Sequence, residues 1–583
     1  MAPAFKNMIK TLKTFYRFVL KKRLIFVGFA LLVLASAVLG SILPYFYKLF
    51  VNALPSFNPH ELFRIVFLYI GVSVAALFID IASYFVGDVI LFEASVDARK
   101  TIFKHVLDLD FAFHSGKSTG GLISAFKRGD GAFFDLFHII HHRIADVVIS
   151  FIVMVYFFTQ LNPLIGLVAV ISMAVTIILT RFLIGYNVKK RSEFNKEEDN
   201  IAGIIADNMM NYETVKLFAQ EKNEEGRLSV AFKAWMKALW GFGNSFRLID
   251  ITIGSIINLG IFAILTVSVL GAINQKIGVG DFVLIAAFTS SLFPRLWDLV
   301  WSSRDMAKAY SDIQRYFALL DYKIEVKDPE KPVKVSNIYG EVEFNNVKFA
   351  YKNRGKNAID GITLKIEQGQ SIALIGRSGS GKTTLAKLLM RFYDIDSGEI
   401  SIDGINIKDF TKDTLRSFIG VVPQEPVLFN NTIAYNIGYG APSAKLAKIK
   451  AAAKLANIDE FIESLPEKYK TEVGERGVKL SGGQKQRLAI ARMILSDPDI
   501  VVFDEATSHL DSESEKLIQD AFWKARAGKT TVIIAHRLST VMRADKIVVM
   551  EWGKIKEIGT HNSLLKNKAG LYSHFWNLQI KLD

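Results

Sequence analysis

A glycine-rich segment is the first place where residue types and spacing indicate chemistry. Residues 376–383 read GRSGSGKT, after the apolar run SIALI and before a helix-forming run. Glycines let backbone N–H groups curl around phosphate oxygens, and the start of a helix adds partial positive charge. We predict a phosphate-binding loop in which Lys382 reaches the terminal phosphates and Thr383 ligates Mg²⁺. The residues assigned to this site are Gly376, Ser378, Gly379, Ser380, Gly381, Lys382, Thr383 and Thr384.

Two acidic residues close the apolar run IVVFDE (500–505). Asp504 follows four apolar residues, so we expect it at the carboxyl end of a buried strand, where it would hold Mg²⁺. Glu505 comes next and is the candidate general base for an attacking water. An acidic helix cap is the structural alternative for this pair.

A second anion-binding feature is the segment LSGGQ (480–484), which precedes the helix-forming run KQRLAIARMIL. A serine and two glycines at a helix start present N–H groups to an anion, although an SGG turn alone is commonly only a helix cap. Its place 23 residues before Asp504 is the specific signal. Here the sequence resembles the ABC ATPase family, whose signature is this pentapeptide. The residues assigned to the signature are Ser481, Gly482, Gly483 and Gln484.

The resemblance implies roles for further residues. Tyr351 matches the aromatic that stacks on adenine, and Gln424 matches the glutamine that senses Mg²⁺ and contacts the membrane domain. Asp511 matches the aspartate after the catalytic glutamate, and His536 matches the γ-phosphate histidine. One position departs, because the family usually has a small residue where His509 stands; we assign it no catalytic role. The resulting assignment is Glu505, His536 and Gln424 as catalytic residues, Thr383, Gln424 and Asp504 around Mg²⁺, and Tyr351 and Asp511 at the ATP.

These motifs need an α/β scaffold to position them. Beyond residue 340, short β-branched runs alternate with helical segments, which predicts a soluble domain over 341–583 with a largely parallel sheet. The polar stretch 321–340 contains Pro329 and Pro332 and is predicted to be a linker.

The first half of the chain is apolar enough for a membrane. Residues 24–47 hold 24 consecutive positions without a charge, which as a helix would cover about 36 Å against a hydrocarbon core of about 30 Å. Five more candidate spans lie near 65–87, 144–161, 164–185, 251–272 and 282–300, with a tight turn at Asn162-Pro163. The predicted fold class is therefore a six-span α-helical membrane domain over 24–320, followed by the phosphate-loop ATPase domain.

Basic residues set the expected orientation. The chain has 71 Lys and Arg against 57 Asp and Glu, and the segments 88–143 and 186–247 hold seven and ten of the basic residues. Cytosolic loops carry such an excess, so both long loops, both termini and the ATPase domain are expected in the cytosol, in a bacterial inner or plasma membrane. The basic leader 1–23 is expected to be an interfacial amphipathic helix; cleavage near Ala35-Ser36-Ala37 is the alternative. No cysteine is present, which excludes disulfides and thiolate metal sites.

Six spans ahead of one ATPase domain resemble a half-size ABC exporter. Residues 113–130 and 211–221 look like the two intracellular loops of such exporters, and residues 471–477 match the loop that precedes their signature. The hexapeptide NYETVK (211–216) is similar to half-transporters of heavy-metal tolerance and mitochondrial thiol export.

The resemblance also implies an assembly and a cycle. In this family Ser481 and Gly483 contact the γ-phosphate held by the other subunit, so the ATP site requires a second half-transporter. All ATP motifs in this chain follow the active pattern, which favours a homodimer over a heterodimer. We expect an ATP-driven exporter that works by alternating access in the lipid bilayer, with no nucleic-acid partner. An ATP-gated channel or regulator, or an importer of the same fold, remains an alternative.

The sequence leaves the transported small molecule open. Asp80 is a charge inside a predicted span, and Phe288, Phe293, Trp297 and Trp301 share one face of the sixth span; packing roles are the alternative for both features. Together they favour an amphipathic or cationic solute, of a lipid-like or drug-like kind. Anionic thiol conjugates, glutathione conjugates or peptides are the alternative. The arginines that would receive an anion are Arg181, Arg247, Arg295 and Arg304.

Overall fold

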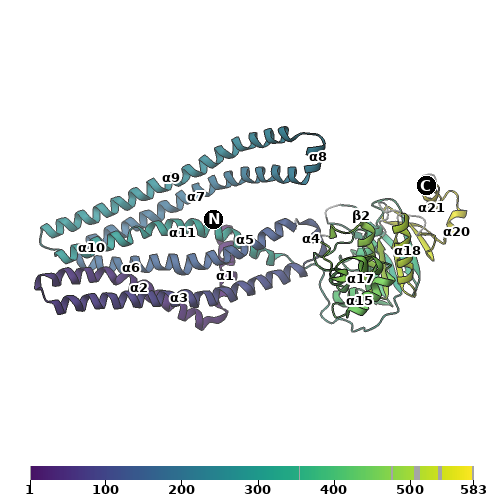
Figure 1. Cartoon of the computed structure of the whole chain (residues 1–583), viewed down its shortest axis with the longest axis horizontal. Coiled ribbons are helices and arrows are strands. Elements are labelled where there is room, and N and C mark those ends of the chain that lie inside the picture. Colours follow the sequence, from purple (N-terminus) through teal and green to yellow (C-terminus); the bar gives the residue numbers. More distant parts are fainter. Residues whose placement is uncertain are drawn as a thin grey trace. The chain divides into compact units, whose positions relative to one another are not determined.

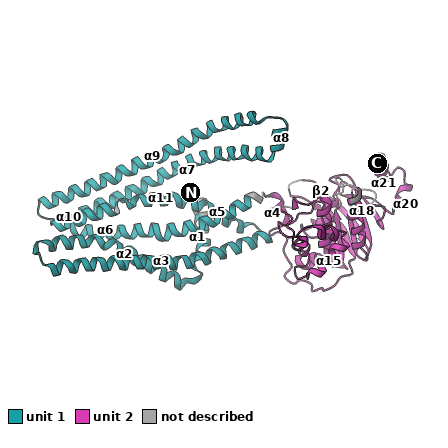
Figure 2. Ribbon diagram, viewed as in Figure 1, with its two compact units in different colours: residues 1–108, 117–323 teal, residues 109–116, 324–583 magenta. Residues whose placement is uncertain are grey.

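The computed structural model describes residues 2–117, 119–352, 355–474, 477–504, 512–535 and 541–580. The chain divides into two compact units, residues 1–108 with 117–323 and residues 109–116 with 324–583 (Figure 2). Each unit is described by itself below.

The first unit is built from long helices (Figure 1), and within its described residues six helical segments are long and apolar enough to cross a membrane. They extend well beyond the apolar runs, as expected if the intracellular loops continue the spans: α3, α7 and α9 have 50, 48 and 53 residues. The α-helices of this unit are α1 (Ala2–Val19), α2 (Arg23–Ala53), α3 (Pro59–Asp108), α5 (Thr119–His138), α6 (Ala145–Leu161), α7 (Pro163–Met210), α8 (Tyr212–Leu217), α9 (Glu221–Ile273), α10 (Val279–Leu292) and α11 (Arg295–Ala318). Its short turns of other helix types are η1 (Leu20–Lys22), η2 (Leu54–Ser56), the π-helix η3 (Ile139–Ile144) and η4 (Leu319–Asp321).

Local sequence explains two features of this unit. The predicted hairpin forms between α6 and α7, where Asn162 is extended and its side chain accepts the amide N–H of Leu164 at 2.9 Å. The leader folds as α1 followed by η1, and Phe15 and Phe18 of α1 are buried in a cluster with α2, α3, α5 and α11. Its basic end is held to α3 by the ion pairs Lys21–Asp97 and Lys22–Glu93.

The second unit is the predicted α/β domain. Its six-stranded sheet has the order β10-β9-β3-β8-β7-β6, with parallel pairing throughout except at β10. A four-stranded antiparallel sheet, β2-β1-β4-β5, was not predicted. The strands are β1 (Val342–Ala350), β2 (Asn357–Ile366), β3 (Ser371–Ile375), β4 (Ser397–Ile402), β5 (Ile405–Asn406), β6 (Ile419–Val422), β7 (Ile500–Asp504), β8 (Thr530–Ile534), β9 (Lys546–Glu551) and β10 (Lys554–Gly559).

Two apolar clusters hold this domain together, one containing Phe503 and Phe522 and the other Phe344 and Phe410. The helices are α4 (Phe111–Gly116), α12 (Lys382–Leu389), α13 (Lys412–Ser417), α14 (Ile433–Gly438), α15 (Leu446–Leu455), α16 (Asp459–Ser464), η5 (Lys468–Lys470), α17 (Gly482–Ser496), α18 (Ser512–Ala525), α20 (His561–Lys566) and α21 (Leu571–Ile580).

Segment 109–116, which the sequence placed in the membrane domain, groups with this second unit. The ring of Phe111 stacks on Phe392 at 5.0 Å, and the carboxylate of Asp110 accepts the amide N–H groups of Glu325 and Val326. The stretch predicted as a linker is likewise tied to the α/β domain, since Asp403 accepts the amide N–H groups of Tyr339 and Gly340.

Candidate functional site

The phosphate loop joins the fully buried strand β3 to helix α12, as predicted. Gly376 has φ +150°, and a Cβ there would lie 2.2 Å from the carbonyl oxygen of Met550. Gly381 has φ +106°, and its Cβ would meet the carbonyl oxygen of Ala358 at 2.8 Å. Gly379 has φ +82° and open space where a Cβ would stand. The loop therefore depends on glycine and leaves room that suits a phosphate group.

Lys382 is buried beneath this loop, with 5% of its surface exposed. Its Nζ donates to the carbonyl oxygens of Gly376 at 2.7 Å and Arg377 at 3.1 Å. Burial lowers the pKa of this ammonium group, and the Asp504 carboxylate acts in the opposite direction. A phosphate group bound in the loop would place an anion beside the buried ammonium group of Lys382 and would stabilise its charged form.

A pocket of about 1020 Å³ collects most of the residues assigned to the nucleotide. The assigned residues that line it are Tyr351, Ser378, Gly379, Ser380, Gly381, Lys382, Thr383, Thr384 and Gln424. The hydroxyl of Tyr351 is 3.1 Å from Oγ1 of Thr384, and its ring meets Phe349 and Tyr393 edge-on. Sequence reasoning missed Trp552 and the start of β2, which line the same pocket.

The residues assigned to Mg²⁺ come from neighbouring parts of the sheet. Strands β6 and β7 pair in parallel, with Val422 opposite Phe503. Gln424 follows the carboxyl end of β6 and Asp504 is the last residue of β7. Ligands bind at this end of parallel sheets, and hydroxyl, amide and carboxylate oxygens suit Mg²⁺, so these residues together with Thr383 fit the ion.

The signature forms a capped helix start. Ser481 is the N-cap of α17: its hydroxyl accepts the amide N–H of Gln484 at 3.3 Å, and its own N–H donates to Oε1 of Gln484 at 2.9 Å. Ser481, Gly482, Gly483 and Gln484 are not among the described residues that line the nucleotide pocket. Glu505, His509, Asp511 and His536 lie outside the described residues, as do Glu475 and Arg476 of the loop before the signature.

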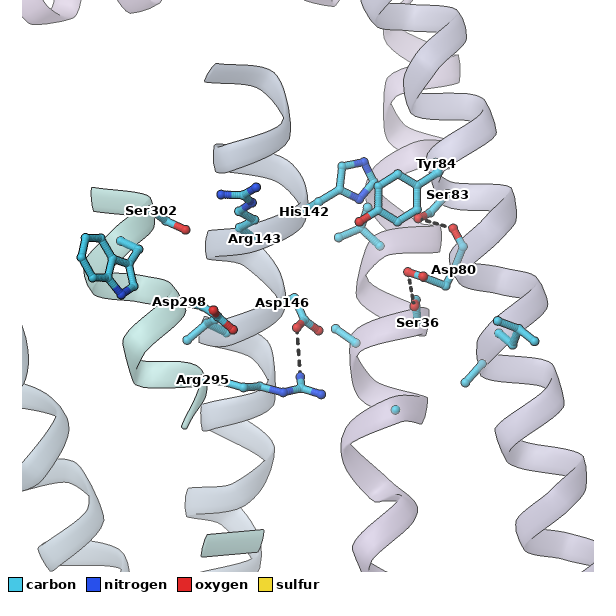
Figure 3. A pocket seen from close by; sticks show the side chains of 17 residues that line it. Ser36, Asp80, Ser83, Tyr84, His142, Arg143, Asp146, Arg295, Asp298 and Ser302 are labelled. Atoms are coloured by element: carbon cyan, nitrogen blue, oxygen red, sulfur yellow. Dashed lines mark hydrogen bonds and ion pairs between the residues drawn. The ribbon is translucent and has the colours of Figure 1, made fainter. Parts of the chain in front are cut away.

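The membrane unit contains a cavity of about 670 Å³ between helices α2, α3, α11 and the third span, which comprises α5, η3 and α6 (Figure 3). Three carboxylates project into it at a similar level from three different helices, Asp80 from α3, Asp146 from α6 and Asp298 from α11 (Figure 3). The ring of Tyr84 lies flat against His142, with centroids 4.1 Å apart. The cavity therefore joins acidic groups to aromatic surface.

Among the residues that the structure describes, one of the three carboxylates forms a close ion pair. Nη1 of Arg295 donates to Asp146 at 2.9 Å and to the hydroxyl of Ser150 at 3.0 Å. Asp80 accepts a hydrogen bond from the hydroxyl of Ser36 at 3.0 Å. Within the described ranges, no cation forms an ion pair with Asp80 or Asp298. The cavity thus holds acidic charge that its own arginines do not pair.

Most of the aromatic and arginine residues considered for the solute do not line this cavity, and for three of the four aromatics the alternative of helix packing is what the structure shows. Phe288 and Phe293 do not line this cavity but are buried in the cluster formed by α6, α7, α9, α10 and α11, and Trp297 packs against that cluster. Of the predicted aromatics only Trp301 lines the cavity. The four arginines do not gather there either, because only Arg295 is among the lining residues. Arg304 instead pairs with Asp305.

Comparisons with known proteins match both units. The model of the ABC transporter transmembrane region matches residues 25–296, and the ABC transporter model matches residues 359–508. A bacterial Atm1-family ABC exporter solved with ATP bound superposes with a TM-score of 0.84 at 34% identity, covering 96% of this chain and 98% of that one.

Two curated relatives extend the likeness. ATP-binding cassette sub-family B member 6 of Mus musculus is 39% identical over 482 residues, 82% of this chain and 57% of that protein. The chain thus spans little more than half of that relative. The ATM1-type heavy metal exporter of Novosphingobium aromaticivorans is 38% identical over 490 residues, 84% of this chain and 80% of that protein.

Proposed function

The chain belongs to the ABC transporter family, with a transmembrane region and an ATPase domain in one polypeptide, and on that premise we propose that it exports a small molecule in an ATP-driven cycle. The observation that carries the proposal is the nucleotide pocket, in which the phosphate loop, Tyr351 and Gln424 line one space. A bacterial plasma membrane is the proposed location.

The proposed chemistry is hydrolysis of the γ-phosphate. The loop amides and Lys382 bind the phosphates, and the ring of Tyr351 stacks on the base. Bound Mg²⁺ would neutralise phosphate charge, held by Thr383, Gln424 and Asp504. Glu505 accepts a proton from the attacking water, and His536 contacts the γ-phosphate.

The proposed working form is a homodimer. The signature around Ser481 does not line the pocket of its own chain, so a second copy is proposed to present its signature to the γ-phosphate. ATP, bound between two copies, stabilises the closed dimer more than the open one, and hydrolysis removes that preference. A heterodimer with a different half-transporter is the alternative.

Two short helices are proposed to transmit the cycle to the membrane. Helix α4 is held to the α/β domain by the stacked rings of Phe111 and Phe392 and by Lys387, whose ammonium lies 5.1 Å from the Phe111 centroid. Helix α8 exposes Tyr212 and Leu217 at its ends, and we assign it to the partner's ATPase domain. Movement of the ATPase domains would then reach α3 and α5 through α4, and α7 and α9 through α8.

The proposed substrate is an amphipathic solute that carries a positive charge. The support is the membrane cavity, where Asp80 and Asp298 accompany the rings of Tyr84 and Trp301. An amine or other organic cation would pair with the carboxylates while its apolar part lay against the rings. The relative named as a heavy metal exporter keeps an anionic thiol or metal conjugate as the second candidate, since Arg295 also lines the cavity.

Inverted membrane vesicles test the function. ATP should drive accumulation of an amphipathic amine against its gradient, and the non-hydrolysable analogue should not. Equilibration without accumulation would indicate a channel, and flux out of the vesicles would indicate an importer. A parallel panel of glutathione conjugates decides between the two substrate classes.

A further inference from the structure

A two-residue turn beside the nucleotide pocket carries a tryptophan that the fold does not require. Glu551 pairs with Lys554 across the β9–β10 hairpin, so Trp552 and Gly553 form its turn. Their φ angles are +51° and +75°. A turn with two positive φ angles favours Asn, Asp or Gly at its first position, where a bulky side chain is disfavoured. The local backbone thus argues against tryptophan, and another role is needed to account for it.

The turn is fastened to the nucleotide site. The amide N–H of Gly553 donates to the carbonyl oxygen of Ser380 in the phosphate loop at 3.1 Å. The carbonyl oxygen of Gly553 accepts the amide N–H of Asp360 in β2 at 2.9 Å. A Cβ at Gly553 would meet the carbonyl oxygen of Ala358 at 2.8 Å. These bonds fix the position of the residue before Gly553 relative to the phosphate loop.

The indole of Trp552 is accessible at this position. It is 79% exposed, and none of the aromatic-ring contacts among the described residues involves it. It lines the same pocket as Tyr351, together with Asn357 and Ala358 at the start of β2. Exposing an indole costs hydrophobic free energy that a planar ligand would recover.

We propose that Trp552 is a second aromatic contact for the base of the bound nucleotide, in addition to Tyr351. The phosphate loop holds the triphosphate, and Tyr351 and Trp552 come from separate elements and line the same pocket. A stacked ring contacts the face of a base and does not read its edge. Trp552 therefore adds affinity for nucleoside triphosphates and none for a triphosphate without a base.

The test uses the full-length chain and the substitution Trp552→Asn, because asparagine suits the turn better than tryptophan does. The melting temperature should stay equal or rise. The Kd of a non-hydrolysable ATP analogue should increase about fivefold to tenfold, the range that loss of one exposed stacking contact gives. Binding of inorganic tripolyphosphate should be unchanged. Trp552→Tyr should restore most of the analogue's affinity.

Intrinsic fluorescence supplies a second readout. The chain has seven tryptophans, and the analogue should quench part of their emission. Trp552→Asn should remove that quenching, whereas Trp576→Phe should keep it, because Trp576 packs against His561 and does not line the pocket. Unchanged affinity and quenching in Trp552→Asn would overturn the proposal, as would an equal loss of tripolyphosphate binding.

The inference rests on nucleotide binding by this pocket, and the tripolyphosphate titration of the unsubstituted protein tests that premise separately. If neither the analogue nor tripolyphosphate binds, the proposed function fails. If both bind and only the Trp552 effect is missing, the proposed function stands and the second aromatic contact is rejected.

Discussion

The nucleotide pocket depends on backbone geometry, whereas the membrane cavity depends on side chains from helices far apart in the sequence. Gly376 and Gly381 occupy positions that a Cβ could not share with neighbouring carbonyl oxygens. The cavity has no such requirement: Ser36, Asp80, Asp146 and Asp298 come from four separate helices, and each could change without altering the backbone. The first kind of site leaves a contiguous motif in a sequence, and the second leaves scattered residues.

Charge is handled differently in the two regions as well. Lys382 is a buried cation whose contacts are loop carbonyls, and a phosphate would complete its surroundings. In the cavity Arg295 already pairs with Asp146, and Arg143 lies 3.8 Å from Asp305, so among the described residues Asp80 and Asp298 are the carboxylates left without an ion pair. Substitutions in the two regions should therefore have different effects. Substitutions in the pocket should reduce ATP binding and hydrolysis, whereas substitutions in the cavity should change which solute is transported.

The largest effect is expected for Glu505→Gln. If Glu505 is the general base, turnover of ATP should fall by about 100-fold or more, because the amide cannot accept the proton. ATP binding should persist, so the closed, ATP-bound form of the dimer should accumulate, as distance measurements between labels on the two ATPase domains would detect. Near-unchanged hydrolysis in this variant would contradict the assignment.

The second-largest effect, a loss of ATP affinity, is expected for Gly376→Ala. The added methyl group would stand 2.2 Å from the carbonyl oxygen of Met550, so the loop must shift and ATP affinity should fall at least about tenfold. Gly404→Ala is the matched control, since Gly404 has φ +78° but nothing within 4 Å. It should lose some stability and keep ATP affinity within about twofold, as isothermal titration would measure. Equal losses in both variants would show that backbone strain alone is responsible.

The same contrast explains what the sequence could predict. Three features were predictable because each is encoded by consecutive residues in the sequence. They are the phosphate loop, the strand that ends in Asp504 and the six spans. The cavity was not, because the contact between Asp80 and Ser36 joins residues 44 positions apart in the sequence. Periodicity placed Phe288 and Phe293 on one face of a helix, but it could not say whether that face meets a cavity or the core.

Trp552 escaped prediction for a related reason. Its hairpin is local, yet Tyr351, which lines the same pocket, is some two hundred residues earlier, and only the folded chain brings both to one pocket. The placement of α4 was missed because its partners, Phe392 and Glu325, lie beyond the membrane region in the sequence.

A substitution in the membrane cavity is expected to change which solutes the protein accepts. Asp80→Asn should reduce the stimulation of ATP hydrolysis by an amphipathic amine about fivefold, the loss of about 1 kcal/mol that one partly hydrated ion pair provides. Asp88→Asn is the control, since Asp88 lies on the same helix and does not line the cavity. Equal stimulation in both variants would remove Asp80 from substrate selection. Stimulation by glutathione conjugates alone, lost in Arg295→Gln, would favour the anionic substrate.

A comparison of two helix caps can distinguish a structural role of Ser481 in the signature from a functional one. Ser481 and Thr560 both cap helices in reciprocal capping boxes, so Ser481→Ala and Thr560→Ala should each cost about 1 kcal/mol of stability. Only Ser481 is proposed to meet the partner's ATP, and its loss should lower hydrolysis about threefold further. Thermal melts and steady-state ATPase assays measure the two effects. Equal activity in the two variants would leave Ser481 as a cap alone.

The smallest effect concerns the strand that leads into the phosphate loop. The Asp545 carboxylate accepts the amide N–H of Ser371 at 2.8 Å and its hydroxyl at 2.6 Å. Burial raises the pKa of Asp545, but these hydrogen bonds and Arg526 outweigh it, so the pKa lies below its ordinary value. A carboxyl group whose pKa is lowered in the folded protein stabilises the fold at any pH above its pKa in the unfolded chain. That stabilisation is lost as the pH falls through the folded-state pKa. Asp545→Asn should therefore cost about 1 kcal/mol at pH 7, allowing for solvent exposure, and progressively less toward pH 3. Melting temperatures of both proteins across this range measure the difference, and a difference that did not shrink in acid would mean that packing, not charge, anchors β3.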